Sequence, residues 1–139
     1  MGVWKAMSMK EFTISTDKRC VFIDITDTVD GALADSGVKD GLCLVYVPHT
    51  TAGVFINENA DPDVKTDMLG WFSRAVPEDP RFRHAEGNSD AHIKAVLTGS
   101  SVTVPVTNGS LALGTWQGIY FAEFDGPRPR HFIVSCIAG

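Results

Sequence analysis

The alternation of apolar and polar positions predicts several short β-strands in the first part of the chain. Residues 11–15 and 20–25 alternate apolar and polar residues or run apolar and β-branched, which is typical of strands. Residues 42–47 are apolar on both faces, and this favours a central strand. Residues 53–57 form a further apolar run, which we expect to pair beside the 42–47 strand.

Apolar residues at helical spacing predict two or three short helices. The first is short and can end at Gly37, because glycine readily adopts the left-handed conformation that closes a helix. The clearest helix begins at Asp61-Pro62, since aspartate is a favoured N-cap and proline is tolerated in the first turn, and it stops at Pro77. The third covers about residues 89–98, with Asn88 or Ser89 as its N-cap.

The last third of the chain is predicted to be a closing antiparallel meander. Residues 101–106 alternate valines with polar residues, and Pro105 suggests an edge position because proline cannot donate a ladder hydrogen bond. Asn108-Gly109 is a strong hairpin-turn signal. We expect strand structure to resume at Leu111, to continue to Phe124, and to return over residues 131–137.

These elements predict an α+β fold with a compact β-sandwich core of mostly antiparallel strands. The chain has 139 residues and 44% hydrophobic residues, which suits one domain with its own core. We therefore expect a single domain over residues 1–139, with residues 1–9 as a loosely ordered N-terminal extension.

Charge and cysteine content narrow the possible functions. The formal net charge is −5 and no long basic cluster occurs, which argues against a nucleic-acid partner. No apolar stretch approaches the length of a membrane span or of a signal-peptide core, so we expect no membrane partner. The three cysteines are widely separated in apolar runs, as buried free thiols would be, and this indicates a reducing, cytoplasmic location.

Residues capable of chemistry gather in three polar clusters that follow or separate the apolar elements. The first is His49-Thr50-Thr51, the second begins with Asn57-Glu58, and the third spans residues 84–92. Three of the four histidines lie in these clusters, and a catalytic zinc site typically uses three protein ligands. His49, His84 and His92 are therefore candidate metal ligands, with Glu86, Asp90 and Glu58 available to orient their rings. The same residues also have an ordinary interpretation as exposed polar or capping groups.

Two further segments could contribute to a site. Two glycines flank Trp116 and Gln117 within an apolar strand, where glycine suggests a bulge or the close approach of a ligand. Arg128 and Arg130 could bind a phosphate group or could be solvated loop charges. His131 begins the last strand and is interpreted as a surface or hairpin residue.

Three segments together resemble the signature segments of the YjbQ family, also labelled secondary thiamine-phosphate synthases. They are HTTAGVFINENADPDV, RHAEGNSDAHIKAVLTG and LGTWQGIYFAEFDGPRPR, and they occur in family order. The resemblance extends from about residue 10 to residue 137. It implies a compact α+β fold with a β-sandwich core, a homotrimer, a pocket that holds the histidines, and metal binding. It also implies a weak activity that joins a pyrimidine diphosphate to a thiazole phosphate with loss of pyrophosphate, while the physiological role could differ.

The resulting hypothesis gives each candidate residue a role. A divalent metal, zinc or else magnesium with a diphosphate substrate, is held by His49, His84 and His92. Glu86 or Asp90 orients an imidazole or moves a proton. The small phosphorylated substrate is bound by the remaining candidates, which are Thr50, Thr51, Asn57, Glu58, Asn88, Trp116, Gln117, Arg128 and Arg130.

Two alternatives from other classes stay open: a metal-dependent hydrolase or lyase acting on a small phosphorylated or ester substrate, and a non-catalytic trimeric small-molecule-binding module. Phosphate loops of the types GxxxxGK[ST] and GxGxxG do not occur in the sequence, and neither does GxSxG.

Overall fold

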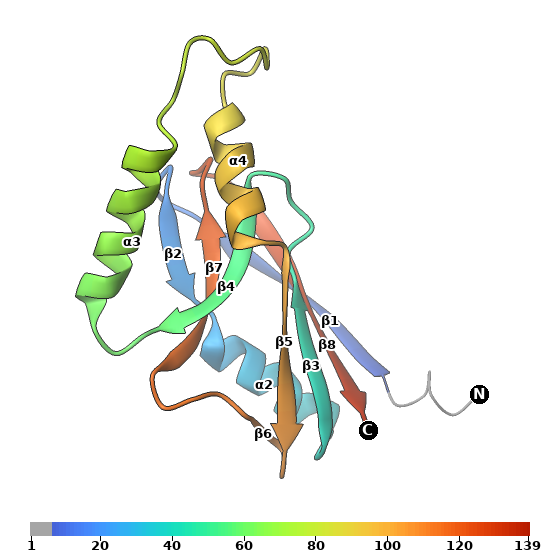
Figure 1. Ribbon diagram of the computed structural model, residues 1–139. Helices are drawn as coiled ribbons and strands as arrows, with labels where there is room; N and C mark the ends of the chain where they lie inside the picture. The colour runs from blue at the N-terminus through green and yellow to red at the C-terminus, as the bar shows by residue number, and fades with distance from the viewer. Residues whose placement is uncertain (1–6) are drawn as a thin grey trace.

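The computed structural model describes residues 7–139, which form eight strands and three helices (Figure 1). The strands are β1 (Met7–Ser15), β2 (Val21–Asp24), β3 (Gly41–Tyr46), β4 (Ala52–Glu58), β5 (Ser101–Thr107), β6 (Ser110–Leu111), β7 (Gln117–Glu123) and β8 (Pro129–Ala138). The helices are α2 (Thr26–Ser36), α3 (Pro62–Ala75) and α4 (Ser89–Thr98). Residues 7–9 of the expected N-terminal extension belong to β1, and residues 1–6 lie outside the described residues.

The strands form two antiparallel sheets, which confirms the α+β class and the antiparallel pairing predicted from the sequence. One sheet has the order β1-β8-β3-β5-β6, and the other has the order β2-β7-β4. Strand β3 lies in the middle of the first sheet, as its doubly apolar pattern predicted. The expected pairing of residues 53–57 with β3 is wrong, because β4 belongs to the other sheet, where β7 is its partner.

The predicted meander is also wrong. The chain forms the β5–β6 hairpin at Asn108-Gly109 and then leaves the first sheet, so residues 112–116 are not strand. Strand β7 is the middle strand of the second sheet, and β8 returns to the first sheet between β1 and β3. A run of apolar residues could not reveal this change of sheet, because both sheets bury the same kinds of side chain.

Strand β7 shows how the layers are assembled. Ile119 and Phe121 point into the larger buried cluster, which also contains residues of the first sheet and of α2. Tyr120, Ala122 and Phe124 point the other way into a smaller cluster with side chains of α3 and α4. Figure 1 shows these two helices on one face of the three-stranded sheet. Because both faces of β7 are covered, its residues 118–122 form an uninterrupted apolar run.

The helix ends predicted at Gly37 and Asp61 follow local chemistry, whereas the one at Asn88 does not. The Asp61 carboxylate accepts a hydrogen bond from the Asp63 N–H at 2.9 Å, and Pro62 begins α3 as predicted. Gly37 ends α2 with φ of 72°. Asn88 precedes α4 at the N-cap position, but its side chain makes no capping hydrogen bond. The structure uses that side chain elsewhere, as described below.

Helix α4 approaches the second sheet closely at Gly53. The Val54 N–H donates to the Gly99 carbonyl at 3.1 Å, directly where α4 ends. A Cβ atom on residue 53 would meet the Thr98 hydroxyl and the Gly99 carbonyl inside van der Waals distance. Gly53 therefore sets how deeply α4 sits against β4. Within residues 7–139, no helix is both long enough and apolar enough to cross a membrane.

Candidate functional site

The three candidate histidines line one pocket with a volume of about 410 Å³. Its walls come from the loop after β3, the loop between α3 and α4 with the start of α4, and the loop between β7 and β8. In Figure 1 these loops lie together at the upper end of the molecule. The lining residues are Pro48, His49, Thr50, Thr51, His84, Glu86, Asn88, His92, Asp125, Arg128 and Arg130. Nine of the fourteen candidate residues thus line a single pocket, together with Pro48 and Asp125.

The imidazoles in and beside this pocket form two pairs. The His84 and His92 ring centroids are 5.3 Å apart, and the rings are nearly perpendicular. The His49 and His131 centroids are 4.6 Å apart. The His131 side chain is 42% exposed and does not line the pocket, as its interpretation as a surface residue expected, but His131 contacts His49 through its ring and its backbone N–H. Its position near the start of the final strand carried no signal of this contact.

His49 is held in one orientation and is neutral near pH 7. Its Nε2 accepts a hydrogen bond from the His131 backbone N–H at 3.0 Å. Burial lowers the pKa of His49 most, and the positive charges of Arg130 and His131 lower it further. In a neutral imidazole one nitrogen accepts and the other donates, so Nδ1 carries the proton. His49 is therefore arranged to donate a hydrogen bond through Nδ1.

The donor set only partly suits a metal ion. Two imidazoles bound tetrahedrally to one zinc, each about 2.0–2.1 Å from it, have ring centroids roughly 5 Å apart, and the His84–His92 pair matches this separation. His49 differs, because its Nε2 is engaged by a backbone N–H. In the part of the chain that the structure describes, no group of three His, Cys, Asp or Glu side chains is placed to hold an ion. The pair His84–His92, with Glu86 on the same wall, is the set that fits best.

A buried ion pair forms the floor of the pocket. Arg130 donates from Nε to Glu123 at 2.9 Å and from Nη2 to the Thr51 hydroxyl at 2.8 Å. The Glu123 Oε1 atom that accepts from Arg130 Nε also accepts from the Thr16 hydroxyl at 2.7 Å. Burial raises the pKa of Glu123, but the hydrogen bonds from Arg130, Thr16 and the Asp125 N–H outweigh it, so its pKa lies below the ordinary value. The pair keeps both residues charged.

This ion pair changes the role expected of Arg130 and gives a role to Glu123, which was not a candidate. Arg130 is 4% exposed and its charge is balanced by Glu123, so it positions Thr51 and lowers the pKa of His49. Sequence analysis missed Glu123, although one carboxylate within the apolar run GIYFAEF is a signal that a buried cation lies nearby.

Asn88 connects the start of α4 to the β7–β8 loop. Its Nδ2 donates to the Asp125 carboxylate at 2.7 Å, and the same carboxylate oxygen accepts from Arg128 Nη2 at 3.1 Å. Arg128 also donates to the Asp125 carbonyl at 2.7 Å. The Asn88 Oδ1 atom is buried and has no hydrogen-bond partner among residues 7–139. Arg128 remains about half exposed and is the cation most available to a ligand in the pocket.

Asp90 does not belong to this pocket. It is 1% exposed, and its carboxylate binds Arg19 through two hydrogen bonds of 3.0 and 3.1 Å and Lys94 through one of 3.1 Å. Two helical positions are about 200° apart around the axis, so Asp90 and His92 point to opposite sides of α4. The expectation that Asp90 orients an imidazole is corrected by this geometry, and the spacing of Asp90 and Lys94 was the signal that could have revealed it.

Four other candidates lie at the opposite end of β4. Glu58 pairs with Gln117 in the β4–β7 ladder, six residues along the strand from Ala52, which is roughly 20 Å. Their side chains serve local turns: Glu58 accepts from the Ala60 N–H, Asn57 accepts from the Glu58 N–H, and Gln117 accepts from the Gly114 N–H. Trp116 is 63% exposed beside them. The structure therefore separates Asn57, Glu58, Trp116 and Gln117 from the histidine pocket, contrary to expectation.

Known proteins resemble this chain over nearly its whole length. The family described as UPF0047 protein YjbQ-like matches residues 10–139. A UPF0047 protein of Methanocaldococcus jannaschii is 54% identical over 127 residues, which cover 91% of this chain and 92% of the relative. The UPF0047 protein YugU of Bacillus subtilis is 55% identical over 123 residues, which cover 88% of this chain and 93% of that protein.

Solved structures agree with the fold. A YjbQ/UPF0047 family protein of Clostridium acetobutylicum has a TM-score of 0.90 and 53% sequence identity, covering 92% of this chain and 99% of its own. A YbjQ-like protein of Sulfolobus solfataricus has a TM-score of 0.91 at 32% identity, covering 96% of this chain and 98% of its own. These names identify a family rather than an activity, so the function has to be argued from the pocket.

Proposed function

This chain belongs to the UPF0047 family of YjbQ-like proteins, and we propose that its histidine pocket binds a small phosphorylated molecule together with a divalent metal. We further propose a weak thiamine-phosphate synthase-type transfer, in which a thiazole phosphate is joined to a pyrimidine diphosphate. The observation that carries the proposal is the convergence of three histidines and two arginines, from three separate segments of the chain, on one pocket of about 410 Å³.

The size and lining of the pocket support a small phosphorylated ligand. Pockets for small molecules usually have volumes of about 300–1,000 Å³, and this one lies in the lower part of that range. Arg128 offers a partly exposed guanidinium, which suits phosphate oxygens. His49 offers its Nδ1–H, and Thr50 offers an exposed hydroxyl on the same loop. These donors favour an anion over a neutral ligand.

We assign the metal to His84 and His92, with zinc as the first choice and magnesium as the alternative for a diphosphate. A bound divalent cation would neutralise charge on a phosphoryl oxygen. In the transfer, a bond forms between the thiazole nitrogen and the pyrimidine methylene carbon, and the carbon–oxygen bond to the diphosphate breaks. Arg128 and His49 stabilise the departing pyrophosphate by donating to its oxygens. Glu86, exposed on the pocket wall, is the carboxylate available to orient an imidazole or to move a proton.

The proposal includes a homotrimer and a cytoplasmic location. Free thiols at Cys20, Cys43 and Cys136 support a reducing compartment. Helix α4 carries exposed apolar side chains beside the pocket, with Val96 81% and Leu97 55% exposed, and such residues are often covered by a second subunit.

The test combines metal content with turnover. We expect about one equivalent of metal in the wild type, lost in the His84→Ala and His92→Ala variants and largely retained in His49→Ala. His49→Ala should instead weaken substrate binding, because it removes a donor and keeps the ion. Gln117→Ala, about 20 Å along the sheet, is the matched control and should leave both measurements unchanged.

Each contrary result discriminates between functions. Metal retained in both His84→Ala and His92→Ala would refute the assignment of the ion. Faster turnover of simple phosphate or ester substrates than of the thiamine precursors would indicate a hydrolase or lyase. Stabilisation by phosphorylated ligands without turnover under any metal would indicate a binding module.

A further inference from the structure

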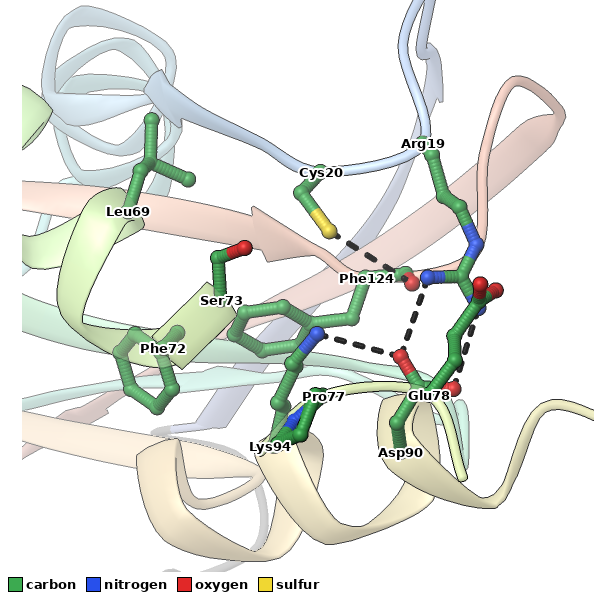
Figure 2. Close-up of a pocket in the computed structure, with 10 residues that line it drawn as sticks. All are labelled: Arg19, Cys20, Leu69, Phe72, Ser73, Pro77, Glu78, Asp90, Lys94 and Phe124. Atoms are coloured by element: carbon green, nitrogen blue, oxygen red, sulfur yellow. Dashed lines mark hydrogen bonds and ion pairs between the residues drawn. The ribbon is translucent and has the colours of Figure 1, made fainter. Parts of the chain in front are cut away.

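A second cavity lies on the other side of helix α4, between α4, α3 and the strands β2 and β7. Its volume is about 260 Å³, and none of its lining residues is shared with the histidine pocket. Figure 2 shows the arrangement, with the charged groups of Arg19, Asp90 and Lys94 at one side and the ring of Phe124 beside them. The full lining is Arg19, Cys20, Leu69, Phe72, Ser73, Pro77, Glu78, Asp90, Lys94 and Phe124.

The Lys94 ammonium group is buried and incompletely paired. Lys94 is 4% exposed, and it donates one hydrogen bond, to Asp90 at 3.1 Å. An ammonium group has three donors, so two of them have no protein acceptor among the described residues. Buried donors are normally satisfied, and leaving them without a partner costs free energy. Figure 2 shows the Lys94 nitrogen extending from α4 into the space beside Phe124 and Ser73, which is where an acceptor would lie.

The charged groups at the base of the cavity are one carboxylate and two cations. Asp90 and Lys94 are buried, whereas the Arg19 side chain is 37% exposed and pairs with both Asp90 and Glu78. Burial raises the pKa of Asp90, but the hydrogen bonds from Arg19 and Lys94 outweigh it and lower the pKa overall, so the carboxylate is ionised. Glu78 pairs with Arg19 at 3.2 Å, but its side chain is 67% exposed at the mouth, where water screens its charge.

Apart from Ser73, the rest of the wall is apolar. Leu69 and Phe72 come from α3, Phe124 follows β7, and Pro77 closes the end. Cys20 adds to this apolar character, because burial raises the pKa of its thiol and keeps it protonated. A ligand with an apolar body would therefore contact the aromatic and aliphatic side chains while its acceptor oxygens meet Lys94.

We propose that this cavity binds a small carboxylic acid with a compact apolar or aromatic body, its carboxylate on Lys94 and its body against Phe72, Phe124 and Leu69. The proposal is independent of the chemistry assigned to the histidine pocket. It uses the face of α4 opposite His92, so a ligand here would contact the same helix that carries part of the other site.

The probe is benzoate, titrated into uniformly ¹⁵N-labelled full-length protein while amide chemical shifts are recorded. We expect saturable shifts at residues 19–20, 72–73 and 90–94, with a dissociation constant of about 1 mM, as for other ligands of this size. Benzyl alcohol and benzylamine keep the ring and replace the carboxylate with a neutral or a positive group. Each should bind at least about tenfold more weakly, because a charged hydrogen bond is lost.

Three variants test the geometry. Lys94→Met should weaken benzoate binding at least about tenfold. Ser73→Phe, an exposed position at the wall, should block entry and abolish the shifts without disturbing the buried charges. Glu78→Gln should act in the opposite direction and tighten binding by about two- to fivefold, because it removes a screened negative charge from the mouth.

Absence of saturable shifts at 20 mM benzoate, equal binding of benzyl alcohol, or unchanged binding in Ser73→Phe would each overturn the proposal. If Lys94→Met proves too unstable to label, the opposite effects of Ser73→Phe and Glu78→Gln decide the question alone. Shifts confined to residues around His49 and Arg128 would place benzoate in the histidine pocket and would also refute the assignment.

Discussion

Removing one partner of the buried pair Arg130–Glu123 should be strongly destabilising, and Arg130→Met tests this directly. The substitution removes the guanidinium and leaves the Glu123 carboxylate, which is 0% exposed, with only the Thr16 hydroxyl and the Asp125 N–H as donors. Breaking a buried pair by removing one partner costs about 3–5 kcal/mol. Whole domains have free energies of unfolding of about 5–15 kcal/mol, so this loss is a large fraction of the total.

The same loss of unfolding free energy can be expressed as a decrease in the melting temperature, Tm. With an unfolding entropy of about 2.1 cal/mol/K per residue, the 139-residue chain has about 0.29 kcal/mol/K, and the expected decrease in Tm is about 10–17 °C. Differential scanning calorimetry at one fixed protein concentration measures it, since association would make Tm depend on concentration.

A second substitution provides the control. Replacing both partners, in Glu123→Met/Arg130→Met, removes the uncompensated charge, and such apolar replacements are often close to neutral. We therefore expect the double variant to be more stable than Arg130→Met, with a coupling energy of at least about 1 kcal/mol in the double-mutant cycle. An Arg130→Met variant within about 1 kcal/mol of wild type, or a cycle with no coupling, would refute the reasoning.

Three further predictions follow from local contacts. Gly53→Ala should lower the free energy of unfolding by about 1–3 kcal/mol in urea titrations, because the added Cβ meets the end of α4. An unchanged free energy of unfolding would mean that the end of α4 shifts freely to make room. Asp61→Ala should lower the free energy of unfolding by about 1 kcal/mol in the same titration, because the α3 N-cap is lost. Asp61→Asn should retain most of that stabilisation. The folded-state pKa values of Glu123 and Asp90 are both lowered, so their contribution to stability is fully present above about pH 4.5 and is lost as the pH falls through those lowered values. Thermal melts from pH 7 to pH 2 should therefore show Tm falling only in the acid range, and a Tm that fell between pH 7 and pH 5 would contradict the assignment.

The helices and most strands could be predicted from the sequence because their signals are local. Asp61-Pro62 begins α3, Gly37 ends α2, and the doubly apolar residues 42–47 form the middle strand of a sheet. Each of these signals depends on neighbours within one or two turns of the chain. The resemblance to the YjbQ family also implied a pocket that holds His49, His84 and His92, and all three line one pocket.

The tertiary structure alone decided which candidates share a site. Asp90 was expected with His92, yet its partners are Arg19, on the loop before β2, and Lys94. Gln117 was expected in the histidine pocket. Strand β7 instead places Gln117 at one end of the three-stranded sheet and Glu123 at the other end, beside Arg130.

The difference has a physical cause. The sequence by itself determined the periodicity of each element, and with it the strands, the helices and the buried face of each, because burial favours the same side chains in any arrangement. It did not determine the partner of each strand or the direction in which a strand runs past the pocket. Those depend on ion pairs and ladders between residues distant in the chain, such as Arg130 with Glu123 and β4 with β7, which form only when the two sheets pack together.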